Sequence, residues 1–220
     1  MKYSYIVMLG FFCFRERGYI MGYRFDIAHL TGQQQAIIRQ RDKENLLHTS
    51  NTPSIKKKEI HPLKIFMKLG FDSTAQSNGR QTLDIYKQFA DSKGAVWFST
   101  DSHTKGMGKA KKNEFINAIK SGKVVEMYFA ISKTSDGENK MIAIAEVQDI
   151  ISEKDGTMTP DSQLTPEQWK TDKNKIWLKI THITYLEHVD CNDFIVASSG
   201  RNLMDIISIS QHHFGYIKHI

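Results

Sequence analysis

The chain has 220 residues, of which 40% are hydrophobic and 10% aromatic. That is enough for one well-packed core, so stabilisation by disulfides is not needed. The formal charge of +6 favours a polyanionic partner, with nucleic acid before a membrane surface. Cys13 and Cys191 are far apart and show no Cys-x-x-Cys or Cys/His spacing, which argues against a disulfide framework and a zinc site. A reduced, intracellular compartment is the default expectation.

Residues 1–60 predict a disordered, basic N-terminal tail. The apolar segment Tyr3–Phe14 is followed at once by Arg15, Glu16 and Arg17. It has no small-x-small cleavage pattern and is too short to span a bilayer, so we expect no signal peptide and no membrane partner. Residues 21–60 are polar with little periodicity and end in a lysine run, which predicts a solvated tail with non-specific phosphate contact.

Residues 61–220 predict an ordered domain that begins with a strand. An apolar run forms this strand, and a polar loop with Asn78-Gly79 as its turn follows. Leu83, Tyr86 and Phe89 lie at helical spacing, which predicts a short helix that ends before Gly94. The strands expected here are 64–69 and 95–99, and the polar loop is 72–80.

The second half of the domain alternates in the same way. A Gly- and Lys-rich loop over 101–109 leads into an amphipathic helix that stops at Gly122. Two strands follow around a polar turn at Asp136-Gly137. A long loop, two further strands and a closing helix complete the chain. The expected bounds are helix 112–120, strands 124–132 and 141–150, loop 153–175, strands 176–180 and 194–197, and helix 203–216. This order predicts an α+β fold, a curved sheet or small β-barrel flanked by helices.

The three tryptophans are the most informative side chains. Trp177 lies inside the apolar run IWLKI and is expected in the core. Trp97 begins Trp97-Phe98-Ser99-Thr100 at the end of a strand, where packing alone would also explain it. Trp169 lies in a polar loop, where its large apolar surface is expected to gain little from packing. Trp169 therefore predicts a binding surface.

Four segments together resemble the YTH domain family, whose related EVE and other PUA-like domains share the layout. Trp97 to Thr100 is similar to the family's W-C-S-T, and Trp169-Lys170 with Trp177 eight residues on is similar to its W-K and later strand Trp. Residues 128–131 and 143–147 resemble two of its strands, and 200–202 resembles the segment before its last helix. Phe98 and Asn202 depart from the family pattern. The resemblance covers about residues 63–220 and implies a PUA-like sheet.

The resemblance implies that the protein is a reader of N6-methyladenosine in single-stranded RNA. The flipped base would lie in an aromatic cage walled by Trp97, Trp169 and Leu164. Ser99 would contact the base edge. Asp72, or Thr74 beside it, is the weaker candidate for the same role.

Phosphate contacts complete the expected site. Arg201 and Lys68 match basic residues that meet nucleic acid in the family, and Lys105 and Lys170 lie in or beside loops near the cage. Stacking of single-stranded bases on aromatic rings contributes about 1–3 kcal/mol per base, whereas burial of one methyl adds only about 1 kcal/mol. Methyl preference is therefore expected to be modest, and phosphate contacts are expected to make binding fall with salt.

Three other classes stay open on the sequence. An EVE- or PUA-like sensor of modified bases in DNA would use the same pocket. A protein-interaction module would show no salt-dependent nucleic-acid binding. An enzyme is disfavoured because no G-x-S-x-G, P-loop, H-E-x-x-H or G-x-G-x-x-G motif occurs. We expect no catalytic residues, no metal and no cofactor.

Overall fold

The computed structural model describes residues 58–220 apart from 101–105, 136, 139 and 210–212. These residues belong to the second of two compact units, Lys57–Ile220. The expectations for the N-terminal tail, and that for Lys105, lie outside the described residues.

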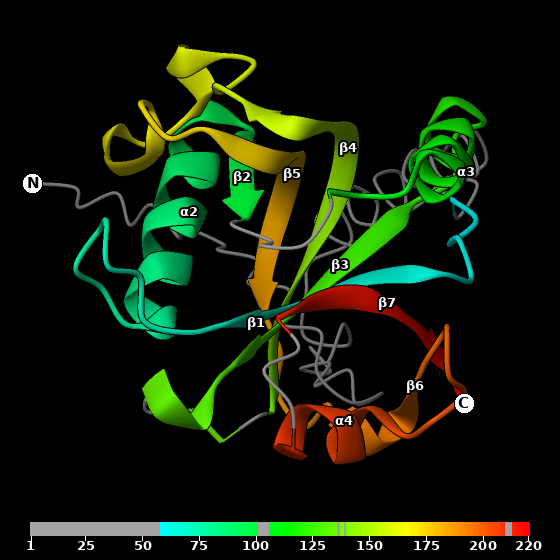
Figure 1. Ribbon diagram of the computed structural model, residues 1–220. Coiled ribbons are helices and arrows are strands. Elements are labelled where there is room, and N and C mark those ends of the chain that lie inside the picture. The colour runs from blue at the N-terminus through cyan, green and yellow to red at the C-terminus, as the bar shows by residue number, and fades with distance from the viewer. Residues whose placement is uncertain (1–57, 101–105, 136, 139, 210–212) are drawn as a thin grey trace, which may run out of the picture. The chain divides into compact units, whose positions relative to one another are not determined.

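The described residues form one seven-stranded sheet with strand order β2-β5-β4-β3-β1-β7-β6 (Figure 1). β1 and β3 pair in parallel, and every other neighbouring pair is antiparallel. The sheet is not closed, because β2 and β6 each end it on one side. The strands are β1 (Lys64–Leu69), β2 (Val96–Thr100), β3 (Val125–Ile131), β4 (Met141–Thr157), β5 (Asn174–Tyr185), β6 (Phe194–Val196) and β7 (Phe214–His219).

Among the described residues, three α-helices flank this sheet. Figure 1 shows α2 (Gly79–Lys93) beside β2 and β5, α3 (Lys109–Lys120) at the far end of β3 and β4, and α4 (Leu203–Ile209) beside β6. α2 is the best defined by its sequence. Asn78 accepts from the backbone N–H of Gln81, whose side chain accepts from the N–H of Asn78 in return, so two N–H groups of the first turn are satisfied. Gly94 ends the helix in the left-handed region, with a φ of 81°.

Two hydrophobic clusters hold these elements together. The larger includes Leu83, Tyr86 and Ala90 of α2 and Phe115 of α3, packed against one side of the strands. Their spacing in α2 puts them on one face of the helix. The smaller cluster packs α4 against β1, β6 and β7. The sheet therefore carries apolar side chains on both faces, as expected where helices cover it from two sides.

The predicted α+β class is confirmed, as a curved sheet flanked by helices and without the closed barrel that was its alternative. Asn78-Gly79 is not a free turn, because it is the N-cap and first residue of α2. The polar loop that precedes the helix therefore ends at Asn78 rather than Arg80.

The predicted closing helix is wrong in its second half. α4 ends at Ile209, and β7 then pairs with β1 and β6. Phe214 and Tyr216 pack against the larger cluster, whereas Ile217 packs in the smaller one. Neighbouring side chains that point to opposite sides of the sheet have the period of a strand. The edge of β1 that does not pair with β3 provides the hydrogen-bonding partner for β7, and the sequence alone does not reveal this pairing.

The predicted loop between β4 and β5 is too long. β4 runs to Thr157 and β5 starts at Asn174, so the connection is 158–173 and both strands exceed their expected lengths. The register between them shifts in three places. Such bulges interrupt the alternation of apolar and polar residues, which is why the apolar pattern stops before the strand does.

The search for membrane spans, made on the described residues alone, identifies no helix with the length and apolarity to cross a bilayer.

Gly79→Ala tests the close contact between α2 and β1. A Cβ at Gly79 would lie 2.9 Å from the backbone oxygen of Leu69 and 3.0 Å from its Cβ. We expect the free energy of unfolding to fall by about 1–3 kcal/mol, since backbone cannot move aside. Urea unfolding measures it. The control is Gly70→Ala, where the nearest atom would be His213 Cε1 at 3.9 Å. Equal effects of both changes would refute the contact.

Candidate functional site

Trp169 is packed inside the protein rather than displayed in a loop. It ends the short 3-10 helix η4 (Glu167–Trp169) and is only 3% exposed. Its ring stacks on Tyr86 of α2 with centroids 4.3 Å apart and planes 11° from parallel. The expectation that Trp169 gains little from packing is therefore wrong, because the apolar surface it covers comes from a helix far away in the sequence.

Asp72 fixes the indole of Trp169 from its edge. Trp169 Nε1 donates to Asp72 Oδ2 over 2.9 Å. Asp72 Oδ1 accepts from the backbone N–H groups of Thr74 at 2.8 Å and Ala75 at 3.0 Å. Both carboxylate oxygens are thus used within the protein, which places Asp72 in the site but leaves it less free for a base edge than the sequence predicts.

Ser99 lies on the other side of Tyr86. The hydroxyl oxygens of Ser99 and Tyr86 are 3.4 Å apart, and the Ser99 backbone N–H donates to the Tyr86 oxygen over 3.5 Å. Burial raises the pKa of Tyr86 well above its usual range, so its hydroxyl stays protonated at neutral pH. Three residues predicted from separate segments, Asp72, Ser99 and Trp169, therefore meet around one tyrosine. We call these four residues the Tyr86 cluster.

Trp97 does not join that cluster. Its strand neighbours Val96 and Phe98 both belong to the larger core cluster, and Phe98 packs against Tyr86 with centroids 4.8 Å apart. Trp97 itself belongs to neither core cluster, although it is only 5% exposed. Among the described residues, Tyr86 stacks on Trp169 and packs against Phe98, and no ring contact joins Trp97 to either Tyr86 or Trp169. The predicted cage of two facing indoles is thus not formed, because the face of Trp169 is covered by Tyr86 and both indoles are buried.

Trp177 and Leu164 are the two remaining aromatic and apolar candidates from the sequence. Trp177 is fully buried in β5 and donates from Nε1 to the carbonyl of Thr157 over 2.9 Å, which confirms it as a core residue. Leu164 is half-buried at the end of the 3-10 helix η3 (Ser162–Leu164), on the same connection as Trp169.

The three described residues predicted to contact phosphate differ in exposure and in their partners. Lys68 is 4% exposed and donates to the carbonyl of Ile207, and burial lowers the pKa of its amine. It stabilises the end of α4 instead of facing a ligand. Lys170 forms an ion pair with Glu167 at 2.6 Å. Arg201 is exposed just before α4 and stays the best-placed cation of this set.

The positive charge of the chain lies mainly outside the described unit. The whole sequence has 30 Lys and Arg against 24 Asp and Glu, and residues 58–220 have 21 against 20. Residues 1–57 therefore hold 9 basic against 4 acidic side chains. The long-range attraction for a polyanion that the composition predicts comes mostly from this N-terminal segment.

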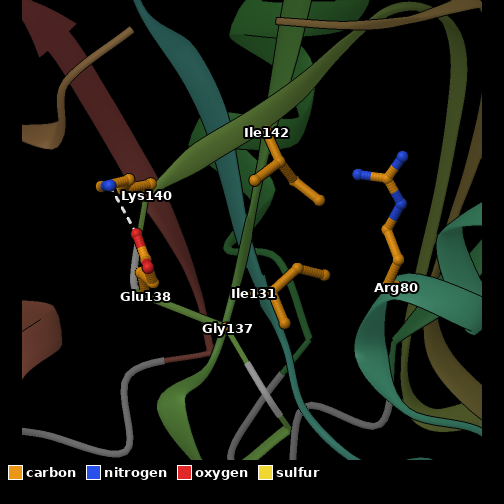
Figure 2. A pocket seen from close by; sticks show the side chains of 6 residues that line it. All are labelled: Arg80, Ile131, Gly137, Glu138, Lys140 and Ile142. Atoms are coloured by element: carbon orange, nitrogen blue, oxygen red, sulfur yellow. Dashed lines mark ion pairs between the residues drawn. The ribbon is translucent and has the colours of Figure 1, made fainter. Parts of the chain in front are cut away.

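A second candidate site lies at the start of α2. A cavity of about 320 Å³ is lined by Arg80, Ile131 and Ile142, with Gly137, Glu138 and Lys140 completing its wall. Figure 2 shows the two isoleucine side chains between the guanidinium of Arg80 and the Glu138–Lys140 ion pair. Sequence reasoning missed this site, because its parts come from three separate segments and no motif joins them.

Other chemistry has little support among the described residues. Cys191 is buried, and desolvation raises the pKa of its thiol to about 12, so it carries little thiolate at neutral pH. Within the part of the chain that the structure describes, no group of three or more His, Cys, Asp or Glu side chains is arranged to hold a metal.

No protein-family model matches this sequence, and neither a curated protein nor a solved structure does. The similarity to YTH domains stays a prediction based on the four motifs.

Asp72→Asn tests the hydrogen bond that holds Trp169. The amide keeps one oxygen for Thr74 and Ala75 but puts an NH₂ where Trp169 Nε1 needs an acceptor. A buried donor left unsatisfied costs about 1–3 kcal/mol, and urea unfolding should show a loss of that size.

The control is Asp72→Asn made in the Trp169→Phe background, where the ring has no N–H. We expect Asp72→Asn to cost much less in that background. An equal cost in both backgrounds would mean that the Asp72–Trp169 bond contributes nothing.

Proposed function

We propose that the protein binds single-stranded RNA and reads N6-methyladenosine, with the base inserted between the rings of Tyr86 and Trp169. The observation that carries the proposal is the near-parallel stack of these two rings, 4.3 Å apart. The two faces are in contact with each other, and a base held from both sides would replace that contact by stacking on each ring in turn. Tyr86 thus takes the role that the sequence assigned to Trp97.

The space that opens when Tyr86 and Trp169 separate is called the slot below. Polar groups that a base edge requires lie at its rim. The Ser99 hydroxyl and backbone N–H lie beside Tyr86, and the Asp72 carboxylate lies beside the Trp169 indole. A base that enters the slot would exchange hydrogen bonds with these groups, which makes them candidates for base-edge recognition. Arg201 and the basic residues of 1–57 supply phosphate contacts along the strand.

Entry requires the two rings to separate, because Tyr86 and Trp169 are 1% and 3% exposed. Their stack contributes about 0.5–1.5 kcal/mol beyond burial, and the bond to the Asp72 carboxylate about 1.5–3 kcal/mol. A base that stacks on both rings regains about 1–3 kcal/mol for each face. These two terms alone nearly cancel, and the apolar surface that the rings lose when they leave the core adds to the cost of opening. Affinity therefore depends on phosphate contacts and discrimination on the methyl.

The test is a fluorescence-anisotropy titration of one short RNA with and without a single N6-methyl, at two salt concentrations. The wild-type chain should bind the methylated strand about 3–10-fold more tightly, since burial of one methyl contributes about 1 kcal/mol. Affinity for both strands should fall with salt. Equal affinity for the two strands would reject methyl reading and leave RNA binding in place.

Three variants locate the slot. Tyr86→Leu should abolish the methyl preference, whereas Tyr86→Phe, which retains the ring, should preserve it. Trp97→Phe should also preserve it, because among the described residues no ring contact joins Trp97 to Tyr86 or Trp169. Circular dichroism and thermal unfolding establish that each variant folds. Loss of the preference in Trp97→Phe with its retention in Tyr86→Leu would put the base elsewhere.

The same oligonucleotide made as DNA separates the proposal from its alternative. Preference for methylated DNA over methylated RNA would support an EVE- or PUA-like sensor of modified DNA bases.

A further inference from the structure

The cavity beside Arg80 is an open surface pocket, and the Arg80 side chain at its edge is half exposed. Its volume of about 320 Å³ is at the lower end of the range for small-molecule pockets, about 300–1,000 Å³. It combines two aliphatic side chains with a guanidinium, and pockets of this composition bind ligands that have both an apolar and an anionic part.

The Arg80 guanidinium is held in position by its neighbours. It lies over the ring of Tyr185 with Cζ 3.9 Å from the centroid, and its Nε pairs with Asp84 Oδ1 at 3.6 Å. Asp84 is itself fixed by a hydrogen bond from the Tyr185 hydroxyl. Because the stack and the ion pair use one face and Nε, the two terminal nitrogens stay available to donate as a fork to two oxygens of one anion.

The apolar wall of the cavity is equally well fixed. Ile131 is 5% exposed and belongs to the main core. The backbone of Gly137 lies so close that a Cβ there would be 2.5 Å from Ile131 Cβ. Ile142 extends this wall toward Arg80 (Figure 2). Side chains packed in this way present a preformed surface, which lowers the entropy cost of binding.

The Glu138–Lys140 pair gives the opposite rim both an acceptor and a donor. Both side chains are largely exposed, at 71% and 65%. The charged side chains at the cavity are the cations of Arg80 and Lys140 and the carboxylates of Glu138 and Asp84. Their charges cancel, so the net charge of the site does not attract an anion. Recognition must then come from directed hydrogen bonds at Arg80 together with burial of an apolar body.

We propose that this cavity binds a nucleoside monophosphate. The phosphate accepts from the terminal nitrogens of Arg80, the sugar and base cover Ile131 and Ile142, and polar groups at the far end of the ligand meet Glu138 and Lys140. A phosphate offers the paired oxygens that a guanidinium fork matches. The proposal does not depend on the methyl slot, since the two sites share no residue.

The experiment titrates the full chain with AMP, adenosine and inorganic phosphate, and follows the isoleucine methyl signals by NMR. AMP should bind more tightly than adenosine or phosphate and should shift Ile131 and Ile142. Arg80→Lys keeps the charge but loses the fork, so AMP affinity should fall at least about tenfold. Lys218→Gln, a loss of charge at an exposed lysine outside both candidate sites, should leave it unchanged.

Several results would overturn the proposal. They are AMP binding no tighter than inorganic phosphate, unchanged AMP affinity in Arg80→Lys, or no shift of either isoleucine at millimolar AMP. Thermal unfolding of Arg80→Lys must first show a folded protein. Lys140→Gln is a second variant that does not change α2, and it should lower the affinity for AMP less than Arg80→Lys does. Tyr86→Leu should still bind AMP, so failure here and failure of the methyl reader are distinguishable.

Discussion

The contact between Trp169 and Tyr86 is the interaction on which the candidate site depends. It joins the connection between β4 and β5 to α2, and the bond from Trp169 to Asp72, 97 residues away in sequence, adds the loop after β1. Three segments that no strand pairing connects are thereby fixed at one place. A tryptophan suits this role because it combines a large apolar face with one N–H donor at its edge.

This contact also limits what the site can discriminate. Opening the rings costs an amount similar to what a base regains by stacking on both of them. Little net free energy is left for affinity, so the strand must be held through phosphates. Since most of the excess positive charge is in residues 1–57, the proposed reader would draw its affinity and its base selection from different parts of the chain.

Local sequence signals predicted most of the fold. Apolar runs located β1, β2 and β3, and the helical spacing of apolar residues ahead of Gly94 located α2, although Asn78 was taken for a turn residue and not for the N-cap. The wrong predictions share one cause: the strand that determines the structure of the segment lies far away in the sequence. β7 is a strand because β1 offers an edge, and β4 continues past Ile150 because β5 pairs with it through bulges. For the site, the sequence identified Asp72, Ser99 and Trp169, but not Tyr86, whose helical spacing indicated only a core position.

The helix α2 connects the two candidate sites and keeps them independent. Tyr86 projects from its buried face, and Arg80 lies in its first turn, where a capping box fixes the backbone. In the proposed open state the ring that moves is Trp169, which belongs to a three-residue 3-10 helix with few backbone bonds to break. A ligand changes the affinity of another site only if it favours a different state of an element that both share. Because α2 is the shared element and stays in place, a base at Tyr86 and an anion at Arg80 should bind without coupling.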